Sequence, residues 1–101
     1  MILRIHPAAE TELIAAAQWY EDRRPGLGER FLAEAAEAFL AVERHPRRFA
    51  KARYQTTREI RRHLLAHFPY SVVYEIREAE CLVVAIAYAG RRPIYWRDRL
   101  K

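Results

Sequence analysis

Arginine side chains gather in the second half of this chain, where several could act together on one anion. Arg61 and Arg62 lie in a segment that alternates weakly between apolar and polar residues, and Arg91 and Arg92 follow the most apolar run of the chain. A planar guanidinium group binds phosphate or carboxylate through two parallel hydrogen bonds. We therefore predict an anion-binding surface. The residues assigned to it are Arg58, Arg61, Arg62, Arg91, Arg92, Tyr95 and Arg97.

Aromatic residues interleave with these arginines. They are Tyr70, Tyr74, Tyr88, Tyr95 and Trp96. Proteins that bind single-stranded RNA combine arginine, which contacts the backbone, with rings that stack on the bases. Similar clusters bind acidic peptides, and Tyr70, Tyr74 and Trp96 fit a protein core equally well. The residues alone leave these alternatives open.

The charge distribution supports a basic surface. The chain of 101 residues carries a formal net charge of +5. Residues 1–45 hold five Arg or Lys and eight Asp or Glu, whereas residues 46–101 hold thirteen and five. This asymmetry indicates an anionic partner, either nucleic acid or an acidic polypeptide, although a solvated arginine-rich surface would give the same pattern.

Other kinds of site lack their usual residues. His63 and His67 have no acidic or thiol ligand at a spacing typical of zinc sites, so we predict no metal and no cofactor. The glycines of the GLG segment at 26–28 follow a predicted helix without the Lys-Ser/Thr pair of a phosphate loop, so they predict a turn. Cys81 lies in an apolar run, where a thiol is inert, and it has no partner for a disulfide.

Two periodicities divide the chain. Apolar residues recur every three or four positions over residues 8–23 and 27–44, which predicts two helices joined by a turn at Pro25 and Gly26. Pro7 suits the first position of the first helix. Strands are predicted over residues 2–6, 57–64, 70–76 and 81–88.

This order of elements predicts an α+β fold: an N-terminal strand, a helical hairpin packed on one face of a mostly antiparallel four-stranded sheet, and a short C-terminal tail. Strict alternation along the last strand would turn Leu82, Val84 and Ile86 toward the helices. Val83, Ala85 and Ala87 would then leave the other face open for a ligand.

The length and composition fit one domain, residues 1–101. Hydrophobic residues make up 51% of the chain and charged residues 31%, a balance typical of a folded protein. The N-terminus lacks the apolar core of a signal peptide, and no apolar run approaches the ~20 residues that span a bilayer. We therefore expect a cytoplasmic protein with no membrane partner.

Nearly the whole chain carries a resemblance to a known protein family. Its most specific segments are FPY at 68–70 and RRPIYW at 91–96, supported by WYE at 19–21 and GLG at 26–28. In order and spacing these resemble the RelE/ParE superfamily of toxins from bacterial type II toxin–antitoxin modules, especially the ParE-like members often called plasmid stabilisation proteins.

The resemblance implies a toxin that is neutralised by a cognate antitoxin in a hetero-oligomer. ParE-like members arrest growth by binding and inhibiting DNA gyrase. RelE-like members are metal-free endoribonucleases that cleave mRNA on the ribosome. An orphan binding module that is no longer toxic is a third possibility. We favour the gyrase-binding hypothesis, because the acidic helices and the restriction of lysine to positions 51 and 101 suit ribosomal RNA poorly.

The nuclease hypothesis requires a base, an acid and cations around the phosphate. Tyr95 stands close to the sequence position at which RelE-like members carry their functional tyrosine. Many ParE-like relatives have a histidine at the position where this chain has Tyr88. Under this alternative the catalytic residues would be Tyr95 or Tyr88 as the base, with its pKa lowered by neighbouring arginines, and Arg61 and Arg91 on the phosphate.

The AYAGRRPIYW segment at 87–96 has a predicted role in either case. We expect Gly90 and Pro93 to turn the chain so that Arg91 and Arg92 stand beside Arg61 and Arg62 on the open sheet face, with Trp96 packed back as an anchor. The antitoxin is predicted to cover this face together with Arg91 and Arg92.

Overall fold

The computed structural model describes residues 1–100 and contains all the predicted elements. In chain order they are β1 (Ile2–Ile5), α1 (Pro7–Arg23), α2 (Leu27–Arg44), β2 (Glu59–Leu64), β3 (Tyr70–Ile76), β4 (Glu80–Tyr88) and a short 3₁₀ helix, η1 (Arg97–Leu100). Each boundary lies within two residues of the predicted one. Within residues 1–100, no helix is long and apolar enough to cross a membrane.

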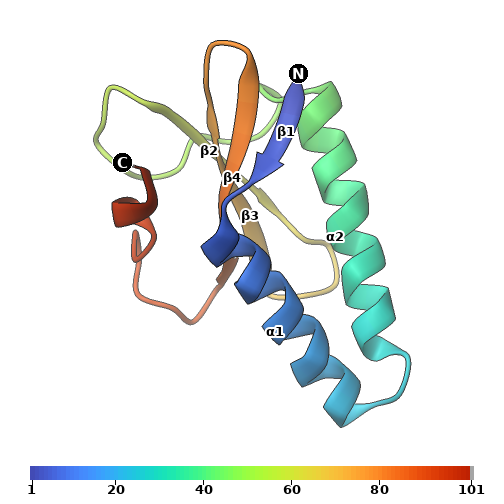
Figure 1. Ribbon diagram of the computed structural model, residues 1–101. Helices are drawn as coiled ribbons and strands as arrows, with labels where there is room; N and C mark the ends of the chain where they lie inside the picture. Colours follow the sequence, from blue (N-terminus) through green and yellow to red (C-terminus); the bar gives the residue numbers. More distant parts are fainter. Residues whose placement is uncertain (101) are drawn as a thin grey trace.

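The strands form one sheet in the order β1-β4-β3-β2. β1 is parallel to β4, whereas β4, β3 and β2 pair antiparallel. The α1–α2 hairpin packs on one face, and the C-terminal segment lies on the other side of the strands (Figure 1). The predicted α+β architecture is therefore confirmed.

The turn between the helices depends on two glycines and one carboxylate. Gly26 adopts a left-handed conformation, with φ of 89°. The Glu21 carboxylate accepts hydrogen bonds of 3.0–3.1 Å from the backbone N–H groups of Gly26 and Gly28. It thus occupies the N-terminus of α2, where unpaired N–H groups favour an anion. The prediction of a turn is confirmed.

Gly28 also sets the distance between the two helices. A Cβ atom at this position would lie 2.5 Å from the Ala17 carbonyl oxygen of α1. Because that contact is with backbone, it is relieved only if the helices move apart.

Gly28→Ala is expected to lower the free energy of unfolding by about 1–3 kcal/mol, the usual cost of overpacking. Urea denaturation measures the change. The matched variant Ala36→Gly alters an exposed position of the same helix and should cost only about 0.5–1 kcal/mol of backbone entropy. A Gly28→Ala protein as stable as the parent would show that the helices have room to spare.

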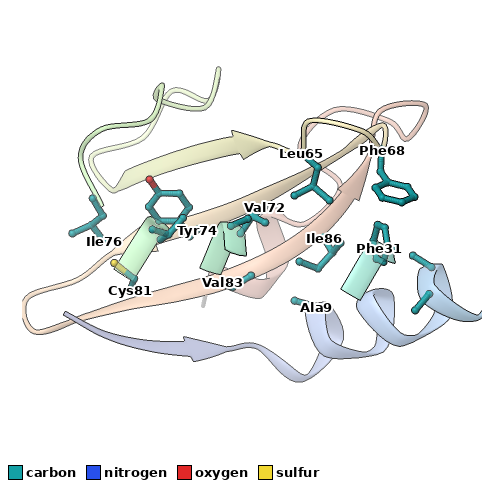
Figure 2. Close-up of a cluster of buried hydrophobic side chains, with 14 residues drawn as sticks. Ala9, Phe31, Leu65, Phe68, Val72, Tyr74, Ile76, Cys81, Val83 and Ile86 are labelled. Atoms are coloured by element: carbon teal, nitrogen blue, oxygen red, sulfur yellow. The ribbon is translucent and has the colours of Figure 1, made fainter. Parts of the chain in front are cut away.

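The main core fills the space between the hairpin and the sheet (Figure 2). Phe31, Phe68 and Tyr20 form edge and tilted ring contacts with centroid separations of 4.8–5.4 Å. Tyr74 is fully buried, and its hydroxyl donates to the Pro46 carbonyl oxygen over 2.6 Å. The polar end of this ring thereby ties the loop after α2 to the centre of the sheet.

The expected facing of β4 is wrong for two of its three bulky residues. Val73 pairs with Ala85 but Tyr74 pairs with Val83, so Val84 is an extra residue at a bulge. The bulge reverses the alternation. Val83 joins Ile86 in the core under the helices, and Leu82 and Val84 belong to the cluster on the opposite face.

The opposite face is also less open than predicted. Trp96, with 5% of its surface exposed, and Leu100 pack there against Ile60, Val73 and Val84. This confirms that Trp96 is an anchor. The C-terminal segment therefore covers the middle of this face and leaves its larger hollow toward the end of β4.

Candidate functional site

Glu12 of α1 holds the C-terminal segment against β4. Its carboxylate accepts hydrogen bonds from the Tyr95 hydroxyl at 2.7 Å and from Arg99 at 2.8 and 3.0 Å. It also accepts one from the Ile86 backbone N–H at 3.0 Å, while Arg99 donates to the Val84 carbonyl oxygen at 3.0 Å. Residues far apart in the chain thus meet at one carboxylate, which gives each of these donor groups a hydrogen-bond acceptor.

This contact changes the chemistry expected of Tyr95. Burial and the bond to the Glu12 carboxylate raise the pKa of Tyr95, because both disfavour a phenolate. Arg91 lies 3.9 Å and Arg99 5.2 Å from the ring centroid, but their opposing effect is smaller. The predicted lowering of the Tyr95 pKa by arginines is therefore wrong.

Four arginines surround a hollow of about 420 Å³ on the sheet face opposite the helices. We call this surface the arginine basin and define it by Arg53, Arg62, Arg91 and Arg92, all of which are exposed. Val73, Ala87 and Trp96 also line the hollow. Among residues 1–100, none of the four forms an ion pair. The basin can therefore accept carboxylate or phosphate groups.

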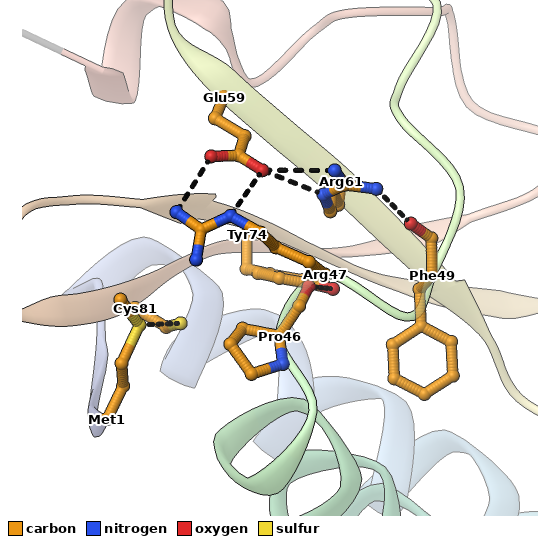
Figure 3. A network of polar contacts seen from close by, with 8 residues as sticks. All are labelled: Met1, Pro46, Arg47, Phe49, Glu59, Arg61, Tyr74 and Cys81. Carbon is orange, nitrogen blue, oxygen red and sulfur yellow. Dashed lines mark hydrogen bonds and ion pairs between the residues drawn. The ribbon is translucent and has the colours of Figure 1, made fainter.

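Three of the six predicted arginines lie outside the basin. Arg61 pairs across the sheet with Tyr74 and Arg62 with Val73, so neighbouring arginines point to opposite faces. Arg61 has only 14% of its side chain exposed, and it donates to the Glu59 carboxylate and the Phe49 carbonyl oxygen (Figure 3). The expectation that Arg61 stands beside Arg91 and Arg92 is wrong.

Arg58 and Arg97 are also outside the basin. Arg58 pairs with Glu75 at 3.3 Å and donates to the Leu100 carbonyl oxygen, so it fastens η1 to the sheet. Arg97 begins η1 with an exposed side chain and does not line the hollow. Arg53, in contrast, is a basin residue that sequence reasoning missed, because its loop carries no periodic pattern that would place it.

A second hollow of about 610 Å³ lies on the helix side of the same end of β4. We call it the aromatic pocket and define it by its rings: Trp19, Tyr20, Tyr70, Tyr88 and Tyr95. Ala15, Ala16 and Ile86 line it as well, and Glu12 and Arg91 are its charged residues. Its lining is therefore largely apolar, with one cation, Arg91, that forms no ion pair within residues 1–100.

The aromatic pocket was not predicted, although the sequence holds one indication of it. Trp19 and Tyr20 are adjacent on one helix, so both cannot point into the same core. Tyr20 packs inward, and Trp19 is left with 50% of its surface exposed.

Tyr88 ends β4 with 48% of its surface exposed, and its ring lies against Gly90. A Cβ atom at Gly90 would stand 2.5 Å from that ring, so any other residue there would require the Tyr88 ring to shift. Tyr88, Arg91 and Tyr95 line both hollows, so these three residues form the wall between them.

Comparison with known proteins places this geometry in context. A family model described as the ParE toxin of type II toxin–antitoxin systems, parDE, matches residues 3–93. A solved structure titled as the chromosomal ParDE toxin–antitoxin system from P. aeruginosa contains a similar chain, with a TM-score of 0.76 at 16% sequence identity. The match covers 89% of this chain and 97% of that chain. No curated protein matches significantly.

Proposed function

Because the chain belongs to the ParE toxin family of type II toxin–antitoxin systems, we propose that it arrests growth in the cytoplasm by binding and inhibiting DNA gyrase. Under this proposal the arginine basin, and not a catalytic centre, contacts the target. A cognate antitoxin neutralises the toxin by covering the same surface.

The observation that carries this proposal is the bond between the Tyr95 hydroxyl and Glu12. A nuclease that uses Tyr95 as its base needs a hydroxyl that releases its proton near neutral pH. Here the hydroxyl is half-buried and donates to a carboxylate, and both effects raise its pKa. Tyr95 is instead placed to hold the Arg91 guanidinium over its ring, at 3.9 Å.

The antitoxin is proposed on charge complementarity. Arg91, Arg92, Arg53 and Arg62 form no ion pair among the described residues, so a partner that brings carboxylates would gain several charge-assisted hydrogen bonds. The similar solved chain comes from a structure titled as a ParDE system. We expect the antitoxin segment that docks on the basin to be acidic.

Tyr95→Phe separates binding from RNA cleavage. A gyrase-binding surface should lose no more than the ~0.5–1.5 kcal/mol of a typical hydrogen bond, so inhibition of supercoiling should weaken less than about tenfold. A nuclease that uses this oxygen as its base should lose a factor of ~10² to 10⁴ in rate. The measurements are gyrase supercoiling in vitro and mRNA cleavage in a ribosome-programmed translation reaction.

Tyr54→Phe is the matched control, because Tyr54 packs against Trp96, with ring centroids 5.7 Å apart, and lines neither the basin nor the aromatic pocket. We expect the parent and both variants to inhibit gyrase and to leave mRNA intact. Codon-specific cuts by the parent that vanish with Tyr95→Phe would overturn the proposal in favour of the RelE-like enzyme.

A further inference from the structure

The aromatic pocket has the features of a site for one large side chain. Its lining combines small or aliphatic residues, Ala15, Ala16 and Ile86, with aromatic rings. Trp19 and Tyr88 leave half of their surfaces in contact with solvent. Concave apolar sites with exposed aromatic walls are where binding energy concentrates at protein interfaces.

The charged residues of this pocket determine which chemical group is favoured next to such a side chain. Its only carboxylate, that of Glu12, is already bound by Arg99, Tyr95 and the Ile86 N–H, so it does not repel an incoming anion. Arg91 lies on the Tyr95 ring at the boundary with the basin. An apolar group with a neighbouring carboxylate therefore matches this pocket better than an apolar group alone.

The position of the pocket links it to the basin. Tyr88, Arg91 and Tyr95 line both hollows, so one partner can fill the pocket and reach the basin without crossing other elements. Arg23 lies 3.6 Å from the centroid of the Trp19 ring, and it provides a second cation beside the pocket.

We propose that the aromatic pocket receives one large apolar side chain of the target protein, whose neighbouring carboxylate binds Arg91 and whose further acidic residues reach the arginine basin. This rests on the proposed inhibition of gyrase, and it adds the site and chemistry of the anchoring contact. Trp19 and Tyr88 are then binding residues that act through their rings.

Two variants test the anchor in the gyrase supercoiling assay with the purified full chain. Trp19→Ala removes a wall of the pocket, and Ala15→Phe fills the pocket from an exposed helix position, which should leave the fold intact. Each should raise the concentration needed for half-inhibition at least tenfold. Leu40→Ala is the matched control, because Leu40 is 48% exposed on α2 outside the pocket, and it should change inhibition less than twofold. Circular dichroism and thermal unfolding confirm that each variant folds.

A small probe tests the chemistry independently of gyrase. N-acetyl-L-phenylalanine, titrated into ¹⁵N-labelled parent protein, should shift the Trp19 indole and Ala15 amide resonances with a roughly millimolar dissociation constant. The uncharged analogue N-acetyl-L-phenylalaninamide should bind several-fold more weakly, and Arg91→Gln should remove that difference.

The outcomes are distinguishable. If the parent inhibits gyrase and the Trp19 and Ala15 variants inhibit it equally well, the anchor is overturned and the proposed function stands. If the parent does not inhibit gyrase, the proposed function is overturned, and so is the assignment of gyrase as the protein that fills the pocket. Unchanged gyrase inhibition with lost antitoxin binding would assign the pocket to the antitoxin and also overturn the proposal. Absence of resonance shifts with the probe would contradict the pocket's chemistry.

Discussion

Replacing Arg91 and Arg92 together by alanine is expected to abolish growth arrest and to leave the fold intact. Both side chains are exposed and form no ion pair among residues 1–100. The stacking of Arg91 on Tyr95 should contribute only about 0.5–1 kcal/mol at such a site. Losing two cations from the basin, in contrast, removes several charge-assisted contacts to a partner at once.

Viable counts after induction measure the effect, and we expect them to recover at least a hundredfold relative to the parent. The control is the double variant Arg30→Ala, Arg44→Ala, which removes the same charge from exposed positions of α2 and should remain toxic. Co-purification with the protein from the adjacent gene tests antitoxin binding in the same variants. Full toxicity of the Arg91, Arg92 double variant would exclude the basin as the target-binding surface.

Glu12→Ala is expected to cause the largest loss of stability among these variants, about 3–5 kcal/mol in the free energy of unfolding. Glu12 and Arg99 have only 16% and 20% of their side chains exposed. Removing the carboxylate leaves the Arg99 charge without its counterion and the Ile86 N–H and Tyr95 hydroxyl without their acceptor.

Urea denaturation followed by circular dichroism measures this loss. Glu10→Ala, an exposed carboxylate in the first turn of the same helix, should cost less than about 1 kcal/mol. Glu12→Gln keeps the shape and one acceptor oxygen, so its effect should fall between the two. A Glu12→Ala protein within about 1 kcal/mol of the parent would mean that the packing of Trp96 and Leu100 and the bond from Arg58 to the Leu100 carbonyl oxygen are enough to retain the C-terminal segment.

The elements of this fold could be predicted because their signals are local. The spacing of apolar residues in α1 and α2, and the turn at Gly26, belong to single segments of sequence. The facing of β4 could not be predicted in the same way. The bulge at Val84 arises from the register between β3 and β4, which depends on pairing between distant residues and not on the strand's own pattern.

The sequence predicted the kind of residue that forms the candidate site, but not which of the arginines meet there. The structure brings Arg62, Arg91 and Arg92 to one hollow, as predicted, because β2 and the end of β4 both flank β3. The prediction for Arg61 was wrong because alternate residues of β2 point to opposite faces, and the sequence does not show which of them face the core. The role of Tyr95 could not be foreseen, because its partner Glu12 lies 83 positions away and nothing in the sequence links them.

The arrangement around Glu12 has a further consequence for the sheet. β1 covers β4 only as far as Val83, where the His6 N–H donates to the Val83 carbonyl oxygen. Past that point β4 is an edge strand, and such an edge invites another chain to extend the sheet. Here the Ile86 N–H is bound by Glu12, the Val84 carbonyl by Arg99 and the Tyr88 carbonyl by the Arg91 N–H. Side chains and a turn have thus sealed this edge against strand addition and edge-to-edge aggregation, so a polypeptide that docks at this end of β4 must be recognised by its side chains.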